Sequence, residues 1–125
     1  MVDKEEIIVE GQPKAGPYSL AIKTSDLLFV SGQVPSPDSD GIKEQTLSAF
    51  ENVKNILEAA GVGVENIVKV TVYLSDKGDF RKMNRMYKKF FEDNGVTESF
   101  PARTTIEGDP PIARFLIEID VIAAL

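Results

Sequence analysis

The sequence contains no cysteine, no histidine and no tryptophan among its 125 residues. The missing thiols and imidazoles exclude cysteine nucleophiles, zinc sites built from cysteine and histidine, iron–sulfur ligation and a histidine general base. Any proton transfer must therefore use a carboxylate, a lysine, a tyrosine, a backbone group or water. The missing cysteines also leave the redox compartment undefined.

Long apolar runs are missing as well. No stretch approaches the roughly 20 residues that span a bilayer. The first residues, Met1-Val2-Asp3-Lys4-Glu5-Glu6, lack the basic start and the apolar run of a secretory signal. We therefore expect a cytoplasmic protein that makes no membrane contact.

Positive charge is scarce, because 14 lysines and arginines face 20 aspartates and glutamates, which gives a net charge of −6. Sequence-independent binding of nucleic acids needs a basic surface, so this balance disfavours RNA or DNA as a partner. The basic cluster between Arg81 and Lys89 falls at helical spacing beside apolar residues. We interpret it as a solvated helix face.

The length and the apolar content of 42% fit one domain that spans residues 1–125. Apolar residues at a spacing of three and four predict helices over Ile42–Ala60 and from Ser75 or Asp76 to about Asp93. Gly61 and Asn94-Gly95 mark the helix ends. Period-two and continuous apolar patterns predict strands over Glu5–Glu10, Tyr18–Thr24, Leu27–Val34, Ile67–Leu74, Ala102–Glu107 and Arg114–Ala123.

The order β-β-β-α-β-α-β-β predicts an α+β fold in which two helices cover one face of a mixed six-stranded sheet. With Val68, Val70, Val72 and Leu74 toward the helices, the other face mixes polar and apolar side chains: Lys69, Thr71, Tyr73, Glu118 and Asp120 with Ile67, Leu116 and Ile122. This mixture is too apolar for a free surface and too polar for a core, and it is typical of a subunit interface. The pattern therefore predicts an oligomer.

Arg103 and Glu118 are the candidate catalytic residues. An arginine binds a small carboxylate through two parallel hydrogen bonds, and a partly buried glutamate can position a water molecule and take its proton. Structural alternatives remain open, in which Arg103 pairs with Glu107, or Glu118 pairs with Lys69. Asp120 is interpreted as a supporting or structural residue.

Several motifs occur in order along nearly the whole chain: Gly16-Pro17-Tyr18-Ser19, Val30-Ser31-Gly32-Gln33, Asn52-Val53 with Leu57-Glu58-Ala59-Ala60-Gly61, Asp79-Phe80 with Met83-Asn84 and Tyr87, Phe100-Pro101-Ala102-Arg103, and Ile117-Glu118-Ile119-Asp120. In these motifs the sequence resembles the RidA family, also called YjgF/YER057c/UK114, of reactive enamine/imine intermediate deaminases.

The resemblance implies a chorismate-mutase-like fold of the bacillus type and a homotrimer with active sites in the clefts between subunits. It also implies a hydrolase of the 2-iminobutanoate/2-iminopropanoate deaminase type. Such an enzyme converts enamines and imines of the 2-aminoacrylate type to 2-keto acids and ammonia, without a cofactor or a metal.

The resemblance also assigns roles to individual residues. Arg103 matches the arginine that binds the substrate carboxylate, and Glu118 matches the glutamate that positions the attacking water. Thr105 stands where many members have cysteine, and it keeps the backbone groups that contact substrate. The substrate-binding residues implied in this way are Tyr18, Ser31, Gly32, Asn84, Arg103 and Thr105.

Two departures from the family pattern bear on the substrate range. Leu20 stands where the family often has glutamine, and the segment from Gly108 to Ile112 stands where a leucine-proline pair is common.

Three other functions remain open. A non-catalytic trimer could sense small molecules in the same cleft. Ribonuclease activity or translation inhibition is opposed by the acidic charge and the missing histidine. Chorismate-mutase activity is disfavoured, because a single pocket arginine would have to bind a dicarboxylate. It is suggested by fold likeness alone.

Overall fold

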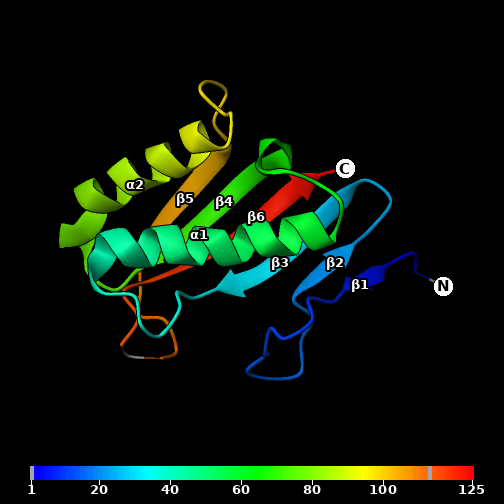
Figure 1. The fold of residues 1–125 in the computed structure, drawn as a ribbon, viewed down its shortest axis with the longest axis horizontal. Helices are drawn as coiled ribbons and strands as arrows, with labels where there is room; N and C mark the ends of the chain where they lie inside the picture. Colours follow the sequence, from blue (N-terminus) through cyan, green and yellow to red (C-terminus); the bar gives the residue numbers. More distant parts are fainter. Residues whose placement is uncertain (1, 113) are drawn as a thin grey trace.

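The computed structural model describes residues 2–112 and 114–125, and its two helices cover one face of a six-stranded sheet (Figure 1). The strand order is β1-β2-β3-β6-β4-β5. β4 and β5 run parallel, and the other neighbours are antiparallel. The predicted α+β arrangement is confirmed. The strands are β1 (Glu5–Ile7), β2 (Ala21–Lys23), β3 (Leu27–Gln33), β4 (Ile67–Leu74), β5 (Ala102–Glu107) and β6 (Ile117–Ala124).

The helices are α1 (Gly41–Ala59) and α2 (Phe80–Asp93), with short 3-10 turns at η1 (Val64–Asn66) and η2 (Lys77–Asp79). Both long helices are followed by a glycine at positive φ, Gly61 at 81° and Gly95 at 87°, as the sequence predicts. Among the described residues, no helix combines the length and apolarity needed to cross a membrane.

The segment before β6 differs from the prediction, because the strand begins at Ile117 and not at Arg114. The backbone N–H of Phe115 donates to the carbonyl of Ile112 (3.0 Å) in a turn. The N–H of Leu116 donates to the side chain of Gln45 (2.8 Å), which leaves it unavailable for a strand ladder. β1 and β2 are also shorter than predicted, and Tyr18 lies in the loop between them.

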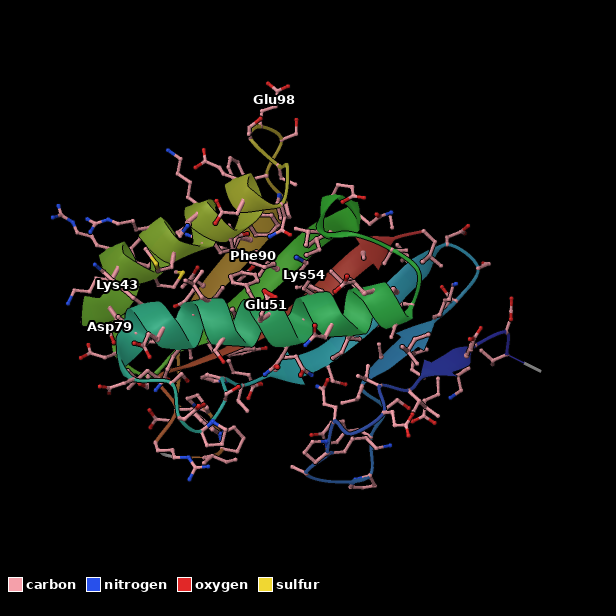
Figure 2. All side chains as sticks on the ribbon, viewed as in Figure 1. Lys43, Glu51, Lys54, Asp79, Phe90 and Glu98 are labelled. Atoms are coloured by element: carbon pink, nitrogen blue, oxygen red, sulfur yellow. The ribbon has the colours of Figure 1, made fainter. Side chains whose placement is uncertain are left out.

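An aromatic cluster joins the two helices and anchors them on the sheet. Phe50 of α1 is fully buried, and its ring stacks on Phe90 with a centroid distance of 4.5 Å. The rings of Tyr87 and Phe91 meet Phe50 edge-on, at 5.4 and 5.6 Å. Figure 2 shows Phe90 between α1 and α2. Aromatic residues dominate core energetics when buried, so Phe50 is the central contact of this layer.

One residue pair of β4 contradicts the predicted alternation. Ile67 is buried on the helix side, opposite Ala123, while Val68 is 45% exposed. The register between β4 and β6 shifts between Ile67 and Lys69, which is a β-bulge. Because a bulge inserts one extra residue, it reverses the facing of every residue before it. The sequence pattern places Ile67 on the open face, and this is wrong.

Replacing Phe50 by alanine tests the aromatic cluster. We expect Phe50→Ala to lower the free energy of unfolding by about 3–5 kcal/mol, because it leaves a cavity between the helices and the sheet. Val68→Ala, at the exposed bulge, is the matched control and should change it by less than about 0.5 kcal/mol. Chemical denaturation measures both, and equal effects would contradict the central position of Phe50.

Candidate active site

Arg103 lies on the helix-covered side of the sheet. It pairs in register with Val70 of β4, which is fully buried beneath the helices. Its guanidinium lies over the ring of Tyr87, 4.7 Å from the centroid, and 5.6 Å from the ring of Phe80. The alternative pairing with Glu107 is absent, because that carboxylate accepts a hydrogen bond from the backbone N–H of Lys77 (2.9 Å) and neither ion pair among the described residues includes Arg103. The guanidinium of Arg103 thus stacks on aromatic rings, and its N–H donors have no carboxylate partner among the described residues.

Two polar side chains of α2 lie on the helix face that contacts Arg103. The amide oxygen of Asn84 and the hydroxyl of Tyr87 are buried, and neither has a hydrogen-bond partner among the described residues. Burial raises the pKa of Tyr87 to about 12, and the Arg103 charge opposes this only in part. The hydroxyl therefore stays protonated at neutral pH. Thr105 lies two residues beyond Arg103 on β5 and therefore shares its face.

Tyr87 appears in a motif of the sequence analysis but is not among the predicted site residues. Its ring does pack on Phe50, but the same ring also supports Arg103. The spacing of Phe80, Asn84 and Tyr87, at four and then three residues, is the signal that connects them, because it places them on one helix face.

Glu118 lies on the opposite, open face of the sheet. It pairs in register with Tyr73, and Asp120 pairs with Thr71. Burial raises the pKa of Glu118, and the neighbouring charge of Asp120 raises it further. Burial also raises the pKa of Asp120, against hydrogen bonds from Tyr73 and Thr71 and the charge of Lys69.

The structural ion pair between Glu118 and Lys69 is absent, since neither ion pair among the described residues includes either side chain. The Lys69 ammonium instead donates to the hydroxyl of Thr104 (2.7 Å). Glu118 is therefore a half-buried carboxylate without an ion-pair partner in the described part of its own chain.

A bulge in β3 makes room for Glu118. Ser31 and Gly32 lie between the register pairs Val30–Val121 and Gln33–Ile119. A side chain at position 32 would place its first carbon 2.8 Å from the carboxyl carbon of Glu118, so only glycine fits without displacing that group. The Ser31 hydroxyl donates to the carbonyl of Ser19 (2.7 Å) and ties the bulge to the Tyr18 loop.

A cleft of about 450 Å³ opens beside this bulge. Its walls are the β1–β2 loop, the end of β3 with the segment that follows it, Asn52 of α1, and the residues before β6. The three connecting segments lie at the same end of the strands (Figure 1). Tyr18 and Gly32 line it. Leu20, one departure from the family pattern, lines it as well, and so does Ile112, the last residue of the segment that forms the other departure. The Tyr18 hydroxyl accepts a hydrogen bond from the N–H of Ala15 (3.1 Å), which folds the loop over the cleft.

The predicted site residues thus form two groups on opposite faces of one sheet. Arg103, Thr105 and Asn84 lie on the helix side, and Ser31, Gly32 and Glu118 lie at the β3 bulge and on the open face. A β-sheet separates its faces by the full thickness of the backbone, so one chain does not bring Arg103 and Glu118 to one small molecule. Among the described residues, no group of three or more acidic side chains is arranged to hold a metal ion.

Comparison with known proteins identifies the family. The family described as Endoribonuclease L-PSP matches residues 10–125. A RutC family protein of Pyrococcus horikoshii is 46% identical over 127 residues, which cover 96% of this chain and 97% of that protein. A protein of Salmonella typhimurium named 2-iminobutanoate/2-iminopropanoate deaminase is 38% identical over 123 residues, 94% of each chain. The chain belongs to the RidA/YjgF family.

Solved structures agree with this assignment of the RidA/YjgF family. The structure of E. coli TdcF with bound serine superposes with a TM-score of 0.87 at 32% identity and covers 97% of this chain and 98% of that one. The E. coli YjgF gene product superposes with a TM-score of 0.87 at 35% identity, over 96% and 98% of the two chains. The chorismate-mutase-like fold implied by the sequence resemblance is confirmed.

The aromatic platform beneath Arg103 is testable with a pair of substitutions at Tyr87. Tyr87→Phe keeps the ring and should leave binding of 2-oxobutanoate, a small keto carboxylate, within about twofold. Tyr87→Leu removes the ring, and it should raise the Kd by roughly threefold to thirtyfold, because cation–π contacts contribute about 0.5–2 kcal/mol. Calorimetric titration measures both variants. Equal effects of the two substitutions would contradict the role of the ring.

The raised pKa of Glu118 predicts a pH-dependent stability difference. Above the ordinary glutamate pKa of about 4.3, the unfolded chain has released the Glu118 proton while the folded chain still holds it. The Glu118 contribution to stability is therefore full at lower pH and is lost as pH rises through the raised pKa. We expect Glu118→Gln to gain stability relative to wild type between pH 4 and pH 7. Denaturant unfolding at both values measures this, and a constant difference would refute it.

Proposed function

We propose that this RidA-family protein hydrolyses reactive 2-imino acids to 2-keto acids and ammonia. The observation that carries the proposal is Glu118, a half-buried carboxylate with a raised pKa. It has no ion-pair partner among residues 2–112 and 114–125, and Gly32 leaves the space that its carboxyl group occupies. A carboxylate of this kind suits the holding of a water molecule and the uptake of its proton near neutral pH.

The arginine of the site would come from a neighbouring copy of the chain. Arg103 and Glu118 lie on opposite faces of the sheet, so a common site requires two chains. We propose a homotrimer in which the open sheet faces meet and each cleft between subunits combines Arg103 of one chain with Glu118 of the next. The open face suits such contact, since Phe29, at 43% exposure, pairs there with Ile122.

The reaction needs few groups. Arg103 binds the substrate carboxylate with two hydrogen bonds, and the Tyr87 ring keeps the guanidinium in place. Asn84 offers a buried amide oxygen to the nitrogen of the imine. Glu118 holds water against the imine carbon and takes its proton as the carbon–oxygen bond forms. That proton passes to the imine nitrogen, which becomes an amine. The new hydroxyl then gives its own proton to the amine while its oxygen forms the carbonyl group, so that the carbon–nitrogen bond breaks and ammonia leaves.

Two relatives support this proposal. The Salmonella relative is named a deaminase of 2-iminobutanoate and 2-iminopropanoate, which are small 2-imino acids. The TdcF structure holds serine, which also joins a carboxylate to an adjacent carbon that carries nitrogen. The serine complex equally suits a second candidate, a trimer that senses small amino acids without turnover. A sensor has no use for a water-holding carboxylate, so Glu118 favours the hydrolase.

The ribonuclease activity in the family description fits this chain poorly. Its net charge is −6 and it lacks histidine, whereas RNA binding needs a basic surface.

Release of 2-keto acid from an imine generated in situ tests the proposal. We expect wild type to accelerate hydrolysis of 2-iminobutanoate, and Arg103→Ala to lower kcat/KM on the order of 100-fold, because two charge-assisted hydrogen bonds are lost. Arg85→Ala removes one exposed arginine on the outer side of α2 and should have no effect. No acceleration by wild type would refute the hydrolase and favour the sensor.

Co-expression of two inactive variants tests the sharing of the site between chains. When each variant is expressed alone, Arg103→Ala and Glu118→Gln should each lower the activity on the order of 100-fold or more. In randomly mixed rings, about one quarter of the sites receive an intact arginine from one chain and an intact glutamate from the next, so about a quarter of the wild-type activity should return. A mixture as inactive as its parents would contradict a shared site.

A further inference from the structure

The cleft beside the β3 bulge is lined by positive charge and no negative charge. Lys14 and Arg114 are among its lining residues, and none of the described residues that line it is an aspartate or a glutamate. The whole chain contains 20 acidic residues and has a net charge of −6. A purely cationic lining in an acidic protein favours an anionic ligand, because local charges set the field inside a cleft.

Arg114 is the better placed of the two cations. Lys14 is already paired with Glu6 at 3.2 Å on the exposed rim. The guanidinium of Arg114 lies over the ring of Phe115, 5.0 Å from its centroid, and neither ion pair among the described residues includes it. The turn that delays the start of β6 is what places Arg114 in the loop at the cleft. Its donors remain available to a carboxylate from outside the chain.

The amide side chains of the cleft bond to one another and to backbone carbonyls. The Gln33 amide nitrogen lies 3.1 and 3.3 Å from the carbonyls of Ser31 and Gly32, and the Gln33 oxygen accepts a hydrogen bond from Gln12 (2.8 Å). Asn52 donates to the carbonyl of Val34 (2.8 Å). Since these amides are engaged and Lys14 is paired with Glu6, a ligand meets apolar walls, the hydroxyls of Tyr18 and Ser36, and the guanidinium of Arg114. This lining suits a short aliphatic chain that ends in a negative charge.

Gly32 connects the cleft with the proposed catalytic carboxylate. It lines the cleft, and it is the residue against which the carboxyl group of Glu118 packs. In the proposed binding mode, the imine carbon lies at Glu118, which is not itself a lining residue of the cleft, and the substrate side chain passes Gly32 to enter it. Its 2-carboxylate would be bound elsewhere, by the neighbour's copy of Arg103.

We propose, building on the hydrolase function above, that Arg114 selects 2-imino acids whose side chain ends in a second carboxylate. The reaction is ⁻OOC–R–C(=NH)–COO⁻ + H₂O → ⁻OOC–R–C(=O)–COO⁻ + NH₃. Water forms the new carbon–oxygen bond and supplies the protons with which ammonia leaves. Each carboxylate then has its own arginine, Arg103 for the one next to the imine and Arg114 for the distal one.

The test compares imines generated in situ by amino-acid oxidases from glutamate, aspartate and 2-aminobutanoate. For the two dicarboxylates, Arg114→Ala should lower kcat/KM about tenfold or more, because a charge-assisted contact is lost. For 2-iminobutanoate, kcat/KM should stay within about twofold, because that substrate has no second carboxylate. Arg85→Ala is the matched control, since it removes one arginine outside the cleft.

Two results would overturn the inference while leaving the hydrolase intact. An equal loss on all three imines would mean that Arg114 binds the common carboxylate. An unchanged kcat/KM for all three imines would mean that Arg114 binds neither carboxylate.

A binding measurement keeps the inference testable if wild type hydrolyses no imine at all. Wild type should bind 2-oxoglutarate about tenfold more tightly than 2-oxobutanoate, and Arg114→Ala should remove this difference. Titration followed by nuclear magnetic resonance, with Gly32 as the reporter, measures both. Tighter binding of 2-oxoglutarate without any turnover of imines would refute the hydrolase function and support the dicarboxylate specificity of the cleft. Equal binding of the two keto acids would refute that specificity.

Discussion

The pairing of β4 with β6 is the constraint on which the rest of the molecule depends. Its register places Val70 and Val72 with Ile119 and Val121 beneath the helices, and Thr71 and Tyr73 with Asp120 and Glu118 on the open face. Because side chains alternate along a strand, burying the apolar set forces the acidic set outward. The half-buried state of Glu118 is thus a consequence of core packing and needs no additional device beyond the glycine at position 32.

Arg103 depends on the same sheet from the other side. β5 pairs with β4 in parallel, so Arg103 takes the face of Val70 and meets α2, where Phe80, Asn84 and Tyr87 follow at helical spacing. The aromatic cluster around Phe50 fixes α2 and thereby the platform for the guanidinium. The ring of Tyr87 therefore has two roles: it packs in the core against Phe50, and it positions the guanidinium of Arg103.

Much of this arrangement is readable from the sequence. The periodicity of α1 and α2 and the exact bounds of β4 and β5 follow from local patterns, which report burial on one face. The facing of Ile67 does not follow, because a bulge is a matter of register between strands. The start of β6 is mispredicted for a similar reason. Arg114 and Phe115 continue the period-two pattern, with Phe115 in the apolar set, but the hydrogen bond from the N–H of Leu116 to the distant Gln45 ends the strand pairing. The site residues were named from motifs, whereas their separation onto two faces follows only from the pairing partners, which a single sequence does not contain.

The separation of Arg103 from Glu118 has a consequence for how such a protein responds to its own abundance. If the working site is assembled from two chains, a folded monomer has both residues and no site. The specific activity then rises with protein concentration and falls on dilution, even though each chain remains intact. Assembly itself becomes the switch, and a change that weakens subunit contact silences the chemistry without touching either charged group.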